Sequence, residues 1–243
     1  MAASRKPAAT RDAVNAGQPD SAKPESGKIA RPMARKRGEI KRTRIIWSAA
    51  EAFARKGYNA TTLSDIAKAA GTQAGSLYYH FSSRDEIIRE VLKCSMSTIA
   101  DSVNAAWAAL PADAPPLRKI LVGIRAHIRT ILSDDPFLPA YNRIINEVSE
   151  TIRDEYVQYP RAYGAMWSEL LAESQRAGEL RASIDPSVAR LLMFGSITWS
   201  QVWFDPKGPR TADEIADELI DICFAGMMTD NGAKVAQGFT NKS

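Results

Sequence analysis

The chain has 243 residues, enough for one small domain and one of medium size. Its content of 45% hydrophobic and 25% charged residues is that of an ordinary globular protein, and no apolar run approaches the roughly 20 residues that cross a bilayer, so we expect a cytoplasmic protein without a membrane partner. Residues 1–38 carry a net charge of +6, residues 39–93 carry +3 and the rest carries −5, so only the N-terminal end suits contact with a polyanion.

Histidine and cysteine, the residues that most often bind metals or act in catalysis, are scarce in this sequence, which argues against an enzyme. His80 and His127 are the two histidines, and Cys94 and Cys223 lie far apart without metal-ligand spacing. The sequence also has no glycine-rich phosphate loop and no GxSxG motif. We therefore expect no catalytic residues, no metal and no cofactor.

The first 38 residues are rich in Ala, Pro, Ser, Gly, Lys and Arg and have almost no large apolar side chains. Such a segment cannot offset the entropy of ordering, so residues 1–38 are predicted to be a disordered basic tail. Arg35-Lys36-Arg37 could contact DNA or could only keep the tail solvated, and the sequence leaves both open.

From Gly38 onward the apolar residues recur at helical spacing, beginning with Ile46, Ala49, Ala50 and Phe53 and ending at Gly57. Capping patterns at Thr62, Ser83, Asp185-Pro186 and Thr211 begin later helices. The pattern predicts helices at about 62–70, 73–79, 83–107, 117–131, 137–148, 153–177, 186–204 and 211–228, no strand, and a flexible tail over 230–243.

The segment Thr61–Phe81 predicts two short helices joined by a tight turn at Gly71. Ala67 and Ala70 are small enough for the helices to cross closely. The second helix exposes small or hydrogen-bonding side chains that suit base edges in a major groove, namely Gln73, Ala74, Gly75, Ser76 and Tyr79.

The region from about Ile40 to Val91 resembles the DNA-binding domain of the tetracycline-repressor (TetR) family. The matching residues are Ala52-Phe53, Gly57-Tyr58, Thr61-Thr62, Ile66-Ala67, Gly71, Ser76-Leu77-Tyr78-Tyr79-His80-Phe81 and Asp85-Glu86. The resemblance implies an all-α transcriptional regulator, with a three-helix helix-turn-helix domain over 39–85 and a helical effector-binding and dimerisation domain over 86–229. It also implies a homodimer that binds a palindromic double-stranded operator and a small-molecule effector.

By this resemblance Gln73, Ala74, Gly75 and Ser76 fall where the family reads bases, and Thr62, Tyr78, His80 and Arg84 fall where it contacts the DNA backbone. The family usually has lysine at the position of Arg84, and we expect arginine to keep the phosphate contact. Tyr78 could instead belong to the core, and His80 could instead cap or pack within the domain.

The C-terminal part carries an excess of aromatic and Met side chains, for which core packing is the alternative to a ligand cavity. The predicted ligand-binding residues are Trp107, Phe137, Tyr141, Tyr163, Met166, Trp167, Leu170 and Trp199. His127 lies on an apolar helix face and is interpreted as a core residue in preference to a ligand contact. Four arginines could meet an anionic group of a ligand or only face solvent: Arg125, Arg129, Arg143 and Arg161.

The segment Trp203–Pro209 resembles a subgroup of TetR-type repressors that control fatty-acid and steroid catabolism. That resemblance implies a hydrophobic effector, with coenzyme A thioesters as one class. The last two predicted helices are expected to form the dimer interface through Leu192, Met193, Ser196, Ile197, Ile215, Leu219, Ile222 and Gly226.

Two alternatives remain at this stage. An architectural DNA-binding protein would need no cavity in its second domain, and an activator would share every feature of a repressor. The sequence does not identify the effector, the operator or the regulated genes.

Overall fold

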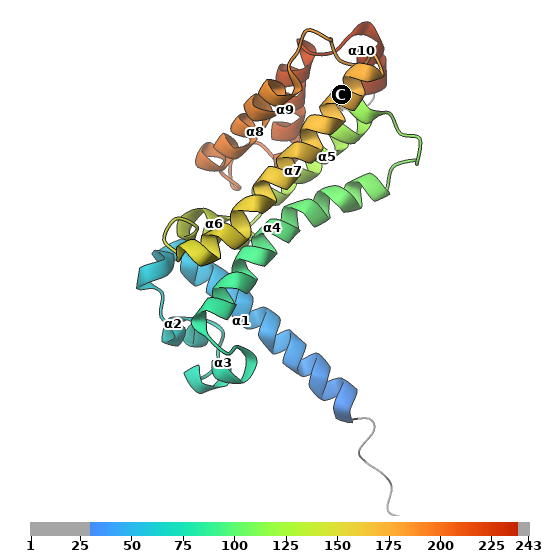
Figure 1. Cartoon of the computed structure of the whole chain (residues 1–243). Coiled ribbons are helices and arrows are strands. Elements are labelled where there is room, and N and C mark those ends of the chain that lie inside the picture. The colour runs from blue at the N-terminus through green and yellow to red at the C-terminus, as the bar shows by residue number, and fades with distance from the viewer. Residues whose placement is uncertain (1–29, 238–243) are drawn as a thin grey trace, which may run out of the picture. The chain divides into compact units, whose positions relative to one another are not determined.

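The computed structural model describes residues 30–237, with side chains from residue 38 onward. Within this part all regular structure is helical, apart from one isolated bridge between Leu180 and Met228, and the predicted all-α class is confirmed (Figure 1). The helices are α1 (Ala30–Ala60), α2 (Leu63–Ala69), α3 (Ala74–His80), α4 (Arg84–Ala108), α5 (Pro116–Ile131), α6 (Phe137–Ile144), α7 (Glu150–Arg176), α8 (Pro186–Trp203), α9 (Ala212–Ala225) and α10 (Asp230–Ala236). None of these helices is long and apolar enough to cross a membrane.

The chain divides into two compact units at Glu39, and the following account concerns the unit that begins at Ile40. The predicted tail over 1–38 lies outside the described residues as far as residue 29. For residues 30–38 the prediction of disorder was wrong, because α1 begins at Ala30. Gly57 interrupts this helix as predicted, with φ of +80°, a conformation that side chains other than glycine rarely adopt.

Side chains at the helix starts explain the remaining boundaries. Thr62 and Asp65 form a reciprocal capping box at α2, and Thr211 and Glu214 form another at α9. The Ser83 hydroxyl accepts the N–H of Glu86 at the start of α4. The predicted starts of these helices therefore rest on local hydrogen bonds that the structure contains.

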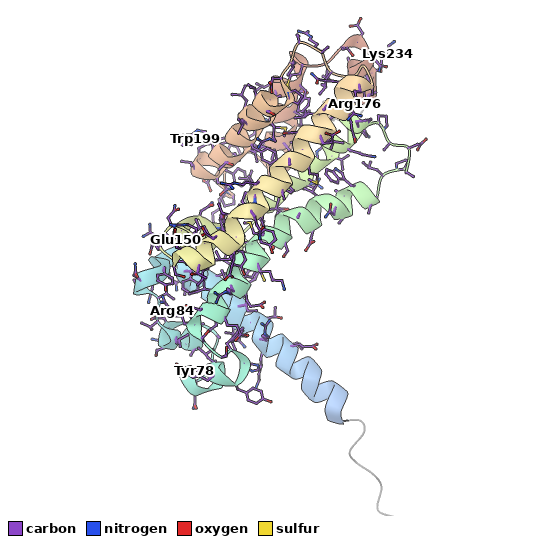
Figure 2. The ribbon with its side chains drawn as sticks, in the orientation of Figure 1. Tyr78, Arg84, Glu150, Arg176, Trp199 and Lys234 are labelled. Atoms are coloured by element: carbon purple, nitrogen blue, oxygen red, sulfur yellow. The ribbon has the colours of Figure 1, made fainter. Side chains whose placement is uncertain are left out.

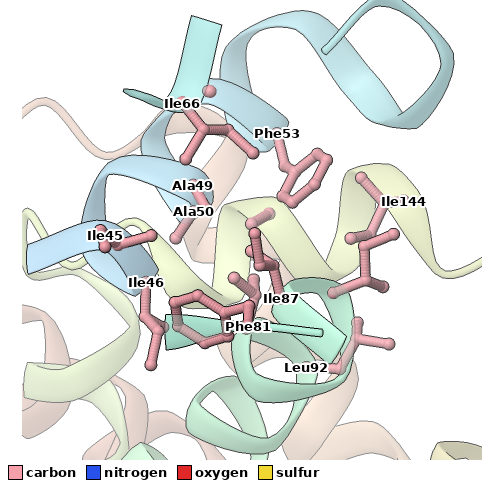
Figure 3. Close-up of a cluster of buried hydrophobic side chains, with 14 of the residues drawn as sticks. Ile45, Ile46, Ala49, Ala50, Phe53, Ile66, Phe81, Ile87, Leu92 and Ile144 are labelled. Atoms are coloured by element: carbon pink, nitrogen blue, oxygen red, sulfur yellow. The ribbon is translucent and has the colours of Figure 1, made fainter. Parts of the chain in front are cut away.

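The buried apolar side chains form two clusters. The first joins α1, α2, α3 and the beginning of α4 to α6 and the beginning of α7, and Figure 3 shows Phe53, Ile66, Phe81 and Ile144 among its members. The second joins the end of α4 to α5, the end of α7, α8 and α9. Helices α4 and α7 each contribute to both clusters, so they connect the helix-turn-helix to the rest of this unit.

The segment after α9 is ordered, which corrects the predicted flexible tail for its first residues. Thr229 caps α10, and its hydroxyl also donates to the carbonyl oxygen of Gly178 at 2.7 Å. Gly232 is buried, and a Cβ at this position would lie 2.1 Å from the carbonyl oxygen of Glu179. The close backbone approach therefore requires glycine.

Gly232→Ala should detach α10 from the protein, although alanine normally favours a helix over glycine by about 1 kcal/mol. The reason is the overlap between the added methyl and the backbone of Glu179. Hydrogen exchange over residues 230–236 should become faster in this variant. Lys234→Ala, an exposed change in the same helix, is the control and should exchange as wild type does. Unchanged exchange in Gly232→Ala would contradict the docked position of α10.

Candidate functional site

The helix-turn-helix consists of α2 and α3, joined by a turn at Gly71 with φ of +64°. The N–H of Thr72 donates to the carbonyl oxygen of Ala67 at 2.9 Å, which closes the turn. Leu77 is the buried anchor of α3, and Phe81, directly after it, is buried beneath the Arg42 guanidinium, 4.9 Å from the ring centroid. The opposite face of α3 is thereby left to solvent.

The predicted base-reading side chains lie on that solvent face. Gln73, Ala74 and Gly75 are exposed, Ser76 is half-buried, and the Gln73 side chain makes no capping bond to the helix. An exposed amide at the start of a short helix is suited to donate to and accept from a base edge. These four residues stay predicted DNA contacts.

Tyr78 and Tyr79 are 63% and 87% exposed, and Figure 2 marks Tyr78 on α3. Exposure of this extent excludes the core alternative for Tyr78. The half-buried His80 ring packs edge-on against Tyr79 at 5.1 Å between ring centroids. Two exposed phenol groups on one short helix are available to bind phosphate oxygens.

Arg84 requires a correction. Its guanidinium donates to the backbone carbonyl oxygens of Tyr58 and Thr61 and lies 4.2 Å from the centroid of the Tyr58 ring. The side chain therefore holds the end of α1 and the segment before α2 onto the start of α4, and these bonds occupy the group that was predicted to contact a phosphate. Thr62 is also engaged locally, since its hydroxyl donates to the Asp65 carboxylate at 2.8 Å.

The C-terminal part contains a cavity of about 590 Å³ between α4, α5, α6, α7 and α8. Three predicted ligand residues line it: Tyr141, Tyr163 and Met166. Side chains that the sequence analysis did not assign to a ligand site also line it, among them Met96, Ile99, Leu138 and Phe194. Ligand pockets in proteins have this size and this mainly apolar lining.

Four of the other predicted ligand residues are packed in the clusters instead. Trp167 is fully buried, 5.8 Å from Trp107 and 5.5 Å from Phe194 between ring centroids. The Trp107 indole N–H donates to the carbonyl oxygen of Lys119 at 2.8 Å. Phe137 packs edge-on against Trp47 in the first cluster, and Leu170 is buried in the second. None of these four lines the cavity.

Trp199, the last predicted ligand-binding residue, is neither buried nor in the cavity. It is 62% exposed and lies on α8 (Figure 2). It belongs to an exposed apolar stripe along α8. The stripe, called here the α8 stripe, consists of Val188, Leu191, Leu192, Trp199, Val202 and Trp203. A contiguous exposed apolar surface of this kind marks an interaction site.

The α8 stripe changes the predicted dimer interface. Leu192, Ser196, Ile222 and Gly226 are exposed, and Ile215 and Leu219 are half-buried, so all six are accessible for pairing. Met193 and Ile197 are 1% and 0% exposed, because they point into the second cluster. Side chains buried in this way are not available to a second copy, whereas Leu191 and Trp199 are accessible apolar side chains, and the interface itself stays a prediction.

His127 and Arg190 line the cavity, although neither was among the predicted ligand-binding residues. His127 Nδ1 and the Tyr163 hydroxyl are hydrogen-bonded at 3.0 Å, and burial lowers the pKa of His127 to about 4. Burial also raises the pKa of Tyr163, so this pair is neutral near pH 7. Arg190 also lines the cavity and is the only charged residue in the sequence of α8, a signal that was present but not used.

The four arginines considered for an anionic ligand do not line the cavity. Arg125 and Arg129 form ion pairs with Asp217 and Asp213 of α9, which fix α5 to α9. A Cβ at Gly57 would meet the Arg143 side chain at 3.3 Å, which places Arg143 beside that turn. Arg161 is exposed.

The comparisons with known proteins agree with this architecture. Residues 45–91 match the family described as bacterial regulatory proteins of the tetR family, and residues 113–227 match the tetracyclin repressor-like C-terminal domain. The chain is 30% identical to a solved TetR/AcrR-family transcriptional regulator from Thermobifida fusca, covering 77% of this chain and 98% of that one with a TM-score of 0.59. The chain belongs to the TetR family.

Two further relatives bear on function. The HTH-type transcriptional repressor KstR2 of Mycolicibacterium smegmatis is 27% identical, over 81% of this chain and 95% of its own length. The structure of AibR in complex with isovaleryl coenzyme A and operator DNA has a TM-score of 0.65 at 19% identity, covering 75% of this chain and 97% of that one. As a member of this family, the chain is a DNA-binding regulator of transcription.

Arg84→Ala should lower the free energy of unfolding by about 1–3 kcal/mol, because the bonds from a charged guanidinium to two carbonyl oxygens are lost. Urea denaturation measures this loss. The slope of operator affinity against salt should stay as in wild type, since no phosphate contact is removed. Gln73→Ala is the counterpart and should leave unfolding unchanged while altering base preference. Unchanged stability together with a flatter salt slope in Arg84→Ala would support the original prediction that Arg84 contacts a DNA phosphate.

Leu191→Glu should convert the dimer to a monomer, because a carboxylate would be desolvated in the middle of the α8 stripe. Light scattering should give twice 26.6 kDa for wild type and 26.6 kDa for the variant. Ala105→Glu, an exposed change on α4, should stay dimeric. A dimeric Leu191→Glu would exclude the α8 stripe from the interface.

Proposed function

We propose that this protein is a repressor that leaves a palindromic operator when a hydrophobic acyl or ring compound, free or as a coenzyme A thioester, fills the cavity. The observation that carries the proposal is the cavity of about 590 Å³, whose walls include helices that also form the core of the DNA-binding part. As a regulator of transcription it would act in the cytoplasm. Similarity to the KstR2 repressor supports repression, and AibR, which has this fold and is bound to isovaleryl coenzyme A and operator DNA together, supports the thioester class but not the release step.

We place the DNA-binding domain at residues 39–85 and the effector-binding and dimerisation domain at residues 86–229. Gln73, Ala74, Gly75, Ser76 and Tyr79 would contact bases. Thr62, Tyr78 and His80 would contact the backbone. The exposure of most of these side chains on α3 supports the assignment.

Three elements connect the cavity to the helix-turn-helix. Helix α4 begins at Arg84 and lines the cavity with Met96, Ile99 and Ala100. Helix α6 lines it with Leu138 and Tyr141, whereas its Phe137 and Ile144 belong to the first cluster. A ligand that shifts α4 or α6 would therefore move the base of the DNA-binding domain.

The third element is α7, which contains Pro160 beside the cavity. Proline removes one backbone hydrogen bond and commonly kinks a helix. Before Pro160, the Tyr156 hydroxyl donates to the carbonyl oxygen of Arg89 at 2.9 Å, and the Glu155 carboxylate pairs with the Arg89 guanidinium. The two ends of α7 thus pack in different clusters. The cavity lies between these ends, at Pro160, where the helix lacks one backbone hydrogen bond.

The loop after α6 adds a direct bond to the DNA-binding part. The Glu147 carboxylate accepts the backbone N–H of Tyr58 at 3.1 Å, immediately after the turn at Gly57. Effector binding must favour the spacing of the two α3 helices that does not fit the operator, or it would not release DNA. A coupling free energy of about 1–3 kcal/mol would lower operator affinity roughly 5- to 150-fold.

The test is a titration of the protein–operator complex, with an operator selected from random palindromes, against acyl-CoA thioesters, fatty acids and steroid acids. We expect at least one class to release the wild type. Ala100→Phe, which fills the cavity from α4, should lose binding of that compound in calorimetry. Ala105→Phe on the exposed face of the same helix should behave as wild type.

No release by any class would exclude the proposed effectors. Normal binding by Ala100→Phe would exclude this cavity as their site.

A further inference from the structure

The cavity contains one charged side chain among the described residues that line it, Arg190 of α8. The rest of the lining is apolar, aromatic or neutral and polar, and the buried His127 is uncharged near pH 7. Arg190 is half-buried in this wall, and a guanidinium binds most strongly where it meets an anion or several acceptors. The position of Arg190 therefore calls for a partner.

The Arg190 guanidinium is held in place from one side only. Its Nε donates to the Ser168 hydroxyl of α7 at 2.9 Å. No carboxylate of the described residues lies within 4.0 Å of the guanidinium to form an ion pair with it. Its partner in α7 is therefore a neutral hydroxyl. The planar fork still has the geometry that binds a carboxylate or a phosphate through two parallel bonds.

The opposing helix leaves room for this group. Gly164 of α7 also lines the cavity, and a Cβ there would lie 2.9 Å from Nη1 of Arg190. Any other residue at this position would have to displace the guanidinium. The sequence of α7 thus provides both the hydroxyl that orients Arg190 and the space into which it fits.

The neighbouring residues give the cavity a polar and an apolar side. Arg190, Phe194, Thr198 and Gln201 recur along one face of α8 and line the cavity together. Met96, Ile99, Ile131 and Leu138 of α4, α5 and α6 line it with apolar groups, beside the uncharged polar side chains of His127, Tyr141 and Asn142, so Arg190 on α8 is the one charged group in the described lining. A ligand that satisfies both sides has an anionic end and a long apolar body.

We propose that Arg190 is the anchor for an anionic group of the effector, and so selects amphipathic anions over neutral hydrocarbons of the same shape. This inference rests on the proposed function for the location of the site. The anion is the carboxylate of a free acid or a phosphate of a coenzyme A thioester. Both provide oxygens for the same guanidinium, and the apolar chain extends toward α4 and α6.

The experiment compares three probes with one ten-carbon chain: decanoate, decanoyl-CoA and 1-decanol. Affinity is measured without DNA by calorimetry, and by the intrinsic fluorescence of the five tryptophans, of which Trp167 packs against the cavity residue Phe194. Wild type should bind at least one charged probe roughly tenfold more tightly than decanol, as expected for charged hydrogen bonds. A preference for decanoate identifies a carboxylate anchor, and a preference confined to decanoyl-CoA identifies the phosphate.

Arg190→Met keeps an unbranched side chain, shorter than that of arginine, and removes the charge, so it should bind the charged probe and decanol about equally. Arg190→Lys should restore part of the preference. Arg176→Met, at the exposed end of α7, is the matched control and should behave as wild type (Figure 2). Ser168→Ala, which removes the orienting hydroxyl, should weaken the preference without removing the charge.

Equal binding of the charged probes and decanol by wild type would overturn the proposal, as would a preference that survives in Arg190→Met. Operator release is scored separately. Charged probes that bind through Arg190 but leave the operator complex intact would contradict the proposed function and leave the anchor in place.

Discussion

The packing of α4 is the constraint on which the rest of the structure depends. Its first turns bury Ile87, Ile88 and Val91 in the same cluster as the helix-turn-helix, and Val103 near its other end belongs to the second cluster. The residues between them line the cavity. One rigid helix therefore contacts the DNA-binding core, the ligand space and the C-terminal bundle, and a shift at any of them is transmitted along it.

The elements that depend on local chemistry could be predicted from the sequence. The break at Gly57 and the capping residues Thr62, Ser83 and Thr211 act through bonds within a few residues of each other, so the pattern contains the whole cause. The exposed face of α3 followed in the same way from the buried Leu77. Helix α10 was missed because its sequence gives no helical period, and its position depends on a distant backbone, that of Glu179.

The site residues show the limit of this approach. Trp167 and Trp199 have the same side chain on amphipathic helices, yet one is fully buried and the other is 62% exposed. The face of a helix that lines the cavity is determined by how five helices cross one another. The periodicity of apolar residues along one helix does not predict how helices cross. Arg84 was misassigned for a related reason, because its carbonyl partners at Tyr58 and Thr61 lie more than twenty residues earlier in the chain.

Helix α8 links the ligand and the dimer in one element. Arg190, Phe194 and Gln201 lie on its cavity face, whereas the α8 stripe with Leu192 and Trp199 lies on a face turned away from the cavity. If two copies pair through the α8 stripe as proposed, this eighteen-residue helix would be packed on both sides and could not rotate to suit one contact without disturbing the other. The occupancy of each cavity would then alter the shared surface. That surface, together with α4, would set the distance between the two α3 helices, so ligand binding would have two routes to the operator.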